Sequence, residues 1–82
     1  MLKVYIKPGC PWCIDAVDWL TKRNYAFEEI NVFGDPRDFD RMRQISSQSK
    51  APTLETDDGL VLPDFDVKQL EKFLDLNNIK PS

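Results

Sequence analysis

Two changes in the spacing of apolar residues within the first 32 positions constrain the fold more than any other feature. Leu2–Ile6 reads Leu-Lys-Val-Tyr-Ile, an alternating β-branched and aromatic pattern that is typical of a strand. After Pro8 and Gly9 the apolar residues recur at helical spacing, which predicts a helix over residues 11–23. Residues 27–32 then return to a strand pattern. Because a helix joins these two strands, they should lie parallel.

A second helix follows the second strand. Asp35 and Pro36 are a typical N-cap and first helical residue, and the helix should run to residue 45 or 46. Phe39, Met42 and Ile45 recur at helical spacing, so we expect them to face inward.

The last third of the chain reads as a hairpin and a helix. Residues 53–56 and 60–62 are short strand patterns around Asp57-Asp58-Gly59, and an Asp-Gly pair between such runs favours a hairpin. Asp66 and Gln69 are spaced as a capping box, with Asp in place of Ser or Thr. The helix that follows would turn inward Val67, Leu70, Phe73, Leu74 and Leu76.

The resulting order, β-α-β-α-β-β-α, predicts an α/β fold. A mixed four-stranded sheet with helices on both faces satisfies this order. The 82 residues are enough for one domain, which we place over residues 1–82.

Composition excludes several classes of function. The net charge is −3 and the chain has no dense basic block, so we expect no binding to nucleic acid. No apolar run approaches the roughly 20 residues of a membrane span. The sequence shows no secretory signal, and we therefore expect a cytoplasmic protein.

The chain has two cysteines, Cys10 and Cys13, and no histidine. A reducing compartment disfavours a static structural disulfide. A zinc site would need two more soft ligands than the chain offers. This count favours redox chemistry. Half of a metal site shared across a dimer, and a chance occurrence of the motif, remain open as alternatives.

The two cysteines lie where a strand turns into a helix. Free backbone N–H groups and the positive end of the helix dipole would favour a thiolate at Cys10, and Lys7 would add a positive charge. Cys13 lies one turn further on, where its thiol can attack a mixed disulfide on Cys10. Pro11 would stiffen this turn, and Trp12 would offer an exposed flat surface to a partner or to glutathione.

The segment Lys7-Pro8-Gly9-Cys10-Pro11-Trp12-Cys13 resembles the active site of the glutaredoxin family, which usually carries Tyr in place of Trp12. Ala51-Pro52-Thr53 is similar to that family's Thr-Val-Pro segment, and the likeness covers almost the whole chain. The resemblance implies a thioredoxin fold with a cis Pro52 beside the nucleophilic cysteine. It also implies that the Ala51 backbone pairs with the cysteinyl part of glutathione. Lys7 and Trp12 would line the same groove.

The same resemblance implies a thiol–disulfide oxidoreductase that reduces protein or glutathione mixed disulfides. Cys10 would attack and Cys13 would resolve the intermediate, with glutathione as the reductant and without a metal. Disulfide-containing or glutathionylated proteins would be the partners of a monomer. Asp66 matches the family before the last helix, where it would cap that helix and help to bind a carboxylate.

Several residues depart from the family pattern. Leu62-Pro63 stands where the family often has Gly-Gly, and Phe39 stands where many members have the Arg or Gln that binds the glycyl carboxylate. Two competing functions follow: a redoxin reduced by a flavoprotein of the thioredoxin reductase type, and an iron–sulfur carrier that holds a cluster with Cys10 of two chains. The basic residues that would replace the missing Arg or Gln are Arg41, Arg43 and Lys50, of which the two arginines are otherwise solvated helix surface.

Four further residues have simpler structural roles. Trp19 should be half-buried packing and Phe65 a core residue near the last helix. Asp15 and Asp18 stand where many relatives have basic residues, and their charges would oppose a thiolate unless they point away into water.

Overall fold

The computed structural model describes residues 1–82 and confirms the predicted order of elements. Four of the predicted bounds are shifted by one residue, since Arg23 caps the first helix and Val32, Thr56 and Leu60 lie just outside the strands, and the other bounds coincide. The elements are β1 (Leu2–Ile6), α1 (Pro11–Lys22), β2 (Phe27–Asn31), α2 (Pro36–Ser46), β3 (Thr53–Glu55), β4 (Val61–Leu62) and α3 (Val67–Leu76).

The four strands form one mixed sheet in the order β2-β1-β3-β4. Strand β1 pairs parallel with β2, as the connecting helix requires, and antiparallel with β3. Strands β3 and β4 form the predicted hairpin, in which Gly59 adopts a φ of 91°. This left-handed conformation favours glycine, so the Asp-Gly signal correctly located the turn.

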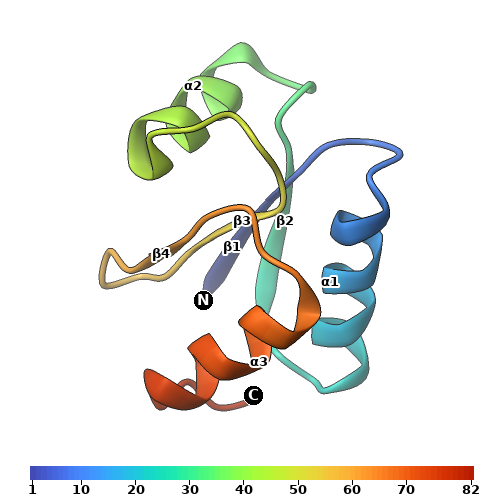
Figure 1. Ribbon diagram of the computed structural model, residues 1–82, viewed down its shortest axis with the longest axis vertical. Helices are drawn as coiled ribbons and strands as arrows, with labels where there is room; N and C mark the ends of the chain where they lie inside the picture. The colour runs from blue at the N-terminus through green and yellow to red at the C-terminus, as the bar shows by residue number, and fades with distance from the viewer.

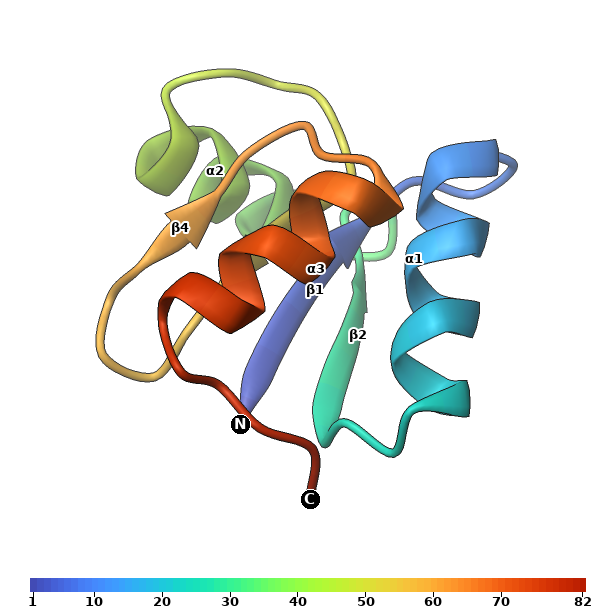
Figure 2. The ribbon, with the colours of Figure 1, turned by 60° about the horizontal axis from the view of Figure 1, so that its bottom comes forward.

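Helices cover both faces of the sheet, with α1 and α3 on one face and α2 on the other (Figures 1 and 2). The side chains of β1 alternate between these layers, as its pattern predicts: Val4 joins the α1 and α3 core, and Tyr5 packs beneath α2. The larger core contains Leu2, Val4, Ala16, Leu20, Leu54, Phe65, Leu70 and Leu74, and the smaller one Tyr5, Val32 and Met42.

The helix ends follow the sequence signals closely. Asp35 accepts from the Arg37 amide, and Asp66 with Gln69 forms a complete capping box. The prediction that Leu76 faces inward was wrong, because its side chain is 75% exposed. Leu76 lies two residues after buried Leu74, about 200° around the helix, and therefore faces away from the core.

No helix in the structure is long and apolar enough to span a bilayer.

A polar bridge joins α2 to the sheet. The Glu55 carboxylate accepts from the Tyr5 hydroxyl at 2.8 Å and from the Arg41 guanidinium at 2.8 Å. Burial acts to raise the pKa of Glu55, but these two donors outweigh it and lower the pKa below its ordinary value of 4.5. Burial and the neighbouring carboxylate raise the pKa of Tyr5 to about 12. Arg41 is exposed, as predicted for solvated helix surface, but the prediction missed its partner, the buried Glu55.

We expect Glu55→Gln to destabilise the fold by about 2 kcal/mol at pH 7, the usual value of a hydrogen bond to a charged group. Since the folded state lowers the pKa of Glu55, its ionised form stabilises the protein above pH 4.5. That contribution is lost as the pH falls through the folded-state pKa. Denaturant unfolding of both proteins from pH 7 to pH 3 measures the difference.

Glu28→Gln is the matched control, because Glu28 is exposed on β2 and no hydrogen bond or ion pair engages it. Its unfolding free energy should stay within about 0.5 kcal/mol of wild type. A Glu55→Gln difference that does not shrink toward pH 3 would contradict the role of the carboxylate charge.

Candidate active site

Cys10 is the N-cap residue of α1, as the sequence predicts. Its backbone is extended, and its Sγ accepts a hydrogen bond from the Cys13 backbone N–H at 3.3 Å. The turn that leads from β1 into this cap passes through Gly9 with a φ of 76°, a conformation that favours glycine. The sulfur therefore occupies the position where backbone donors and the helix dipole stabilise negative charge.

Cys13 lies one turn further along α1, with only 2% of its surface exposed. Burial, together with the neighbouring Cys10 sulfur, raises the pKa of Cys13 to about 12, and the amide and charge of Lys7 only partly offset this. The two thiols are not bonded to each other. One is half-exposed and the other is buried, so only Cys10 is accessible to a large disulfide substrate.

The segment before β3 lies beside Cys10, although it is 41 residues away in sequence. The Cys10 Sγ is 3.8 Å from the Ala51 carbonyl oxygen, and the Ala51–Pro52 bond is cis, as the family resemblance implies. Gln48 holds this segment, since its amide bonds the Lys50 carbonyl and the Thr53 hydroxyl, both at 3.1 Å. No sequence pattern singled out Gln48 beyond its place in a polar loop.

Trp12 and Asp66 line a shared hollow of about 400 Å³ beside the Cys10 end of α1. Trp12 is 60% exposed, and Asp66 caps α3 by accepting from the Gln69 amide at 2.8 Å. Lys50 lines this hollow, and Phe65 is both part of its wall and a core residue as predicted. Among the three basic residues that could replace the missing Arg or Gln, only Lys50 lies here.

Lys7 is held on the side of α2. Its Nζ donates to the Ser49 carbonyl at 2.6 Å and lies 5.5 Å from the Phe39 ring centre. Phe39 stacks on Phe33 with 5.8 Å between ring centres, and Phe33 is 62% exposed. The sequence did not single out Phe33. Only the structure identifies it as part of this surface, because its exposed ring lies beside Lys7.

The acidic residues of α1 lie away from the Cys10 sulfur. Asp18 pairs with Lys22 one turn further on, at 3.0 Å, and Asp15 is exposed. Trp19 is half-buried as expected and stacks on Tyr25 at 5.8 Å.

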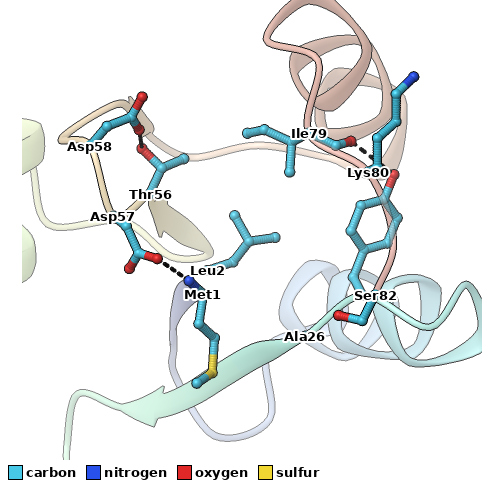
Figure 3. A pocket seen from close by; sticks show the side chains of 10 residues that line it. Met1, Leu2, Ala26, Thr56, Asp57, Asp58, Ile79, Lys80 and Ser82 are labelled. Atoms are coloured by element: carbon cyan, nitrogen blue, oxygen red, sulfur yellow. Dashed lines mark hydrogen bonds and ion pairs between the residues drawn. The ribbon is translucent and has the colours of Figure 1, made fainter.

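No three Cys, Asp or Glu side chains converge to hold a metal ion. Another hollow, of about 320 Å³, opens at the far end of β1, between the hairpin and the chain ends (Figure 3). The amino group of Met1 pairs there with Asp57, and the Tyr25 hydroxyl bonds the Ile79 carbonyl. No cysteine lines this hollow, so the candidate active site is the one at Cys10.

Comparison with known proteins agrees with this geometry. The Glutaredoxin family model matches residues 2–61, and the chain therefore belongs to the glutaredoxin family. It is 32% identical to an uncharacterized glutaredoxin-like 8.6 kDa protein in the rubredoxin operon of Clostridium pasteurianum, over 92% of this chain and 99% of that protein.

The chain is also similar to part of a transcriptional regulator and to two solved structures. The chain is 36% identical to the global transcriptional regulator Spx of Bacillus subtilis over 45 residues, which cover 55% of this chain and only 34% of Spx. The thioredoxin-like protein BC3987 superposes with a TM-score of 0.79 at 30% identity, over 90% of this chain and all of that one. A protein from X. campestris, XcR50, gives 0.65 at 26% identity, over 93% of this chain and 97% of that one. The fold is thus thioredoxin-like.

We expect iodoacetamide at pH 8 to alkylate Cys10 and leave Cys13 unmodified in the folded protein, because Cys13 is buried and its thiol has a pKa of about 12. Fragment-ion mass spectrometry of the digest locates the label. In denaturant both cysteines should react, and folded Cys10→Ser should take up almost no label. Alkylation of Cys13 at a rate close to that of Cys10 would contradict the unequal access of the two thiols.

Proposed function

We propose that this protein is a thiol–disulfide oxidoreductase that works through Cys10 and Cys13. The observation that carries the proposal is the Cys10 sulfur, which caps α1 through the Cys13 N–H and lies beside the Ala51 carbonyl. The Cys10 thiolate attacks a substrate disulfide, forms a mixed disulfide and releases the first substrate thiolate. Cys13 then attacks the Cys10 sulfur, and the Cys10–Cys13 disulfide forms as the second substrate thiolate leaves.

Ala51 and Pro52 supply the binding surface for the substrate chain. In this proposal an extended segment around the substrate cysteine pairs with the backbone of Ala51 as a short added strand. Pro11 and Trp12, which follow Cys10 and are exposed, offer the substrate an apolar surface, and the hollow with Asp66 receives the part of the substrate that precedes its cysteine. The Lys50 ammonium and the first-turn N–H groups of α3 that Asp66 does not bind would hold a carboxylate at that end, against the charges of Asp64 and Asp66.

Glutathione is the proposed reductant, and glutathionylated or disulfide-containing proteins are the proposed substrates of a cytoplasmic monomer. The structure also favours a second reductant, a flavoprotein reductase. Lys7, which would line the glutathione groove, already donates to Ser49 and lies against Phe39. Phe39 itself stands where many family members have the Arg or Gln that binds the glycyl carboxylate. Leu62-Pro63 replaces the paired glycines that would let a γ-glutamyl group approach the backbone.

Cys10→Ser should abolish the reduction of a glutathionylated peptide, measured as NADPH oxidation coupled through glutathione reductase. Cys13→Ser should retain a substantial rate in this assay, because glutathione itself can resolve the mixed disulfide on Cys10. Persistent activity of Cys10→Ser would refute the assigned nucleophile.

The reductant is identified by running wild type in parallel with glutathione plus glutathione reductase, and with thioredoxin reductase alone. Turnover in the first system supports glutathione. Turnover only in the second would assign the protein to the reductase-served redoxins, and Cys13→Ser should then be inactive.

A further inference from the structure

The proposed reaction requires Cys13 to lose a proton, and the carboxylates on the substrate side, Asp64 and Asp66, line a hollow that Cys13 does not reach. Cys13 is 2% exposed, and the chain contains no histidine. Cys10 is consumed in the mixed disulfide at this stage, and Lys7 carries a positive charge. The proton of Cys13 must therefore leave by another route.

A hollow on the far side of Cys13 provides such a route. It measures about 360 Å³ and lies between α1, β2 and the end of β1. Cys13, Val17 and Thr21 line it from successive turns of α1, and Ile6 and Ile14 add apolar wall. Water occupies about 30 Å³ per molecule in the liquid, so several waters fit between Cys13 and the open side.

Two carboxylates line the same hollow, those of Asp18 and Glu29. Glu29 pairs with Val4 in the sheet and shares the α1 face of β2 with Phe27, which packs against the core under α1. Asp18 is already bound to Lys22 at 3.0 Å. Glu29 is exposed, and its side chain has no hydrogen-bond or ion-pair partner, so the carboxylate oxygens can accept a proton from water.

We propose that Glu29 accepts the proton of Cys13, through water in this hollow, during the resolving step. The inference rests on the proposed function. The Cys13 proton passes through water to the Glu29 carboxylate, and the thiolate attacks the Cys10 sulfur. The Cys10–Cys13 bond forms as the bond from Cys10 to the substrate sulfur breaks, and the substrate leaves as a thiolate. Glu29 later returns the proton to solvent. The charged residues that line this hollow together with Cys13 are Lys7 from the loop, Asp18 from α1 and Glu29 from β2.

Stopped-flow reaction of the reduced protein with excess dithiobis(nitrobenzoate) separates the two steps. Attack by Cys10 releases one thionitrobenzoate at a rate that depends on reagent concentration. Attack by Cys13 releases the second at a rate that does not. The second rate is measured between pH 6 and pH 10 for wild type, Glu29→Gln and the matched carboxylate variant Asp18→Asn.

We expect Glu29→Gln to slow the second phase roughly 100-fold at pH 7, the lower end of what a positioned proton acceptor contributes. The first phase should be unchanged. The deficit should shrink as the pH rises, because hydroxide then deprotonates Cys13 directly. Asp18→Asn should stay close to wild type in both phases.

A contradicting result would be easy to recognise in the second phase. If Glu29 were only a nearby negative charge, removing it would favour the Cys13 thiolate and leave the second phase equal or faster. That result, or an equal slowing by Asp18→Asn, would overturn the inference alone. Absence of both phases in wild type would overturn the proposed function and this inference with it.

Discussion

The backbone N–H of Cys13 donates to the Cys10 sulfur, so the side chain that begins helix α1 is also the exposed thiol. Every other part of the site depends on where that helix begins. The left-handed Gly9 turns the chain from β1 into the cap, and Pro11 occupies the first helical position, where no N–H is needed. Parallel pairing of β1 with β2 fixes α1 on one face of the sheet, and β3 on the other side of β1 brings Ala51 to the same sulfur.

The two cysteines differ because they lie at different depths of one helix. Cys10 is at the end of α1, beside the segment that precedes β3. Cys13 faces the layer between the helix and the sheet, where burial raises its pKa. The hollow lined by Glu29 opens on this inner side, away from Ala51 and Trp12. In the proposed reaction the substrate therefore reaches the start of α1 from one side, and the proton of Cys13 leaves on the other.

Local patterns predicted most of the fold and the centre of the site. Alternation in β1, Asp-Pro before α2 and Asp-Gly in the hairpin each reflect contacts between residues close in sequence, which a single chain can reveal. The family resemblance added the pairing of Cys10 with Ala51–Pro52. Interactions between distant residues were not predictable: Arg41 finds Glu55 only because α2 lies across β3, and Lys7 meets Ser49 and Phe39 only once the loops are packed. The prediction for Leu76 failed for a different reason, because its spacing of two residues from Leu74 already places it on the opposite side of the helix.

The burial of Cys13 also affects kinetics. In the proposed reaction, the disulfide of the oxidised protein is open to attack only at Cys10, because Cys13 is buried. The oxidised substrate and the reductant must then occupy the same place in turn and cannot be bound together. Turnover becomes a double displacement in which an excess of either reactant competes with the other. The proposed reaction therefore leaves the protein with one binding place, which the reductant and the oxidised substrate occupy in turn.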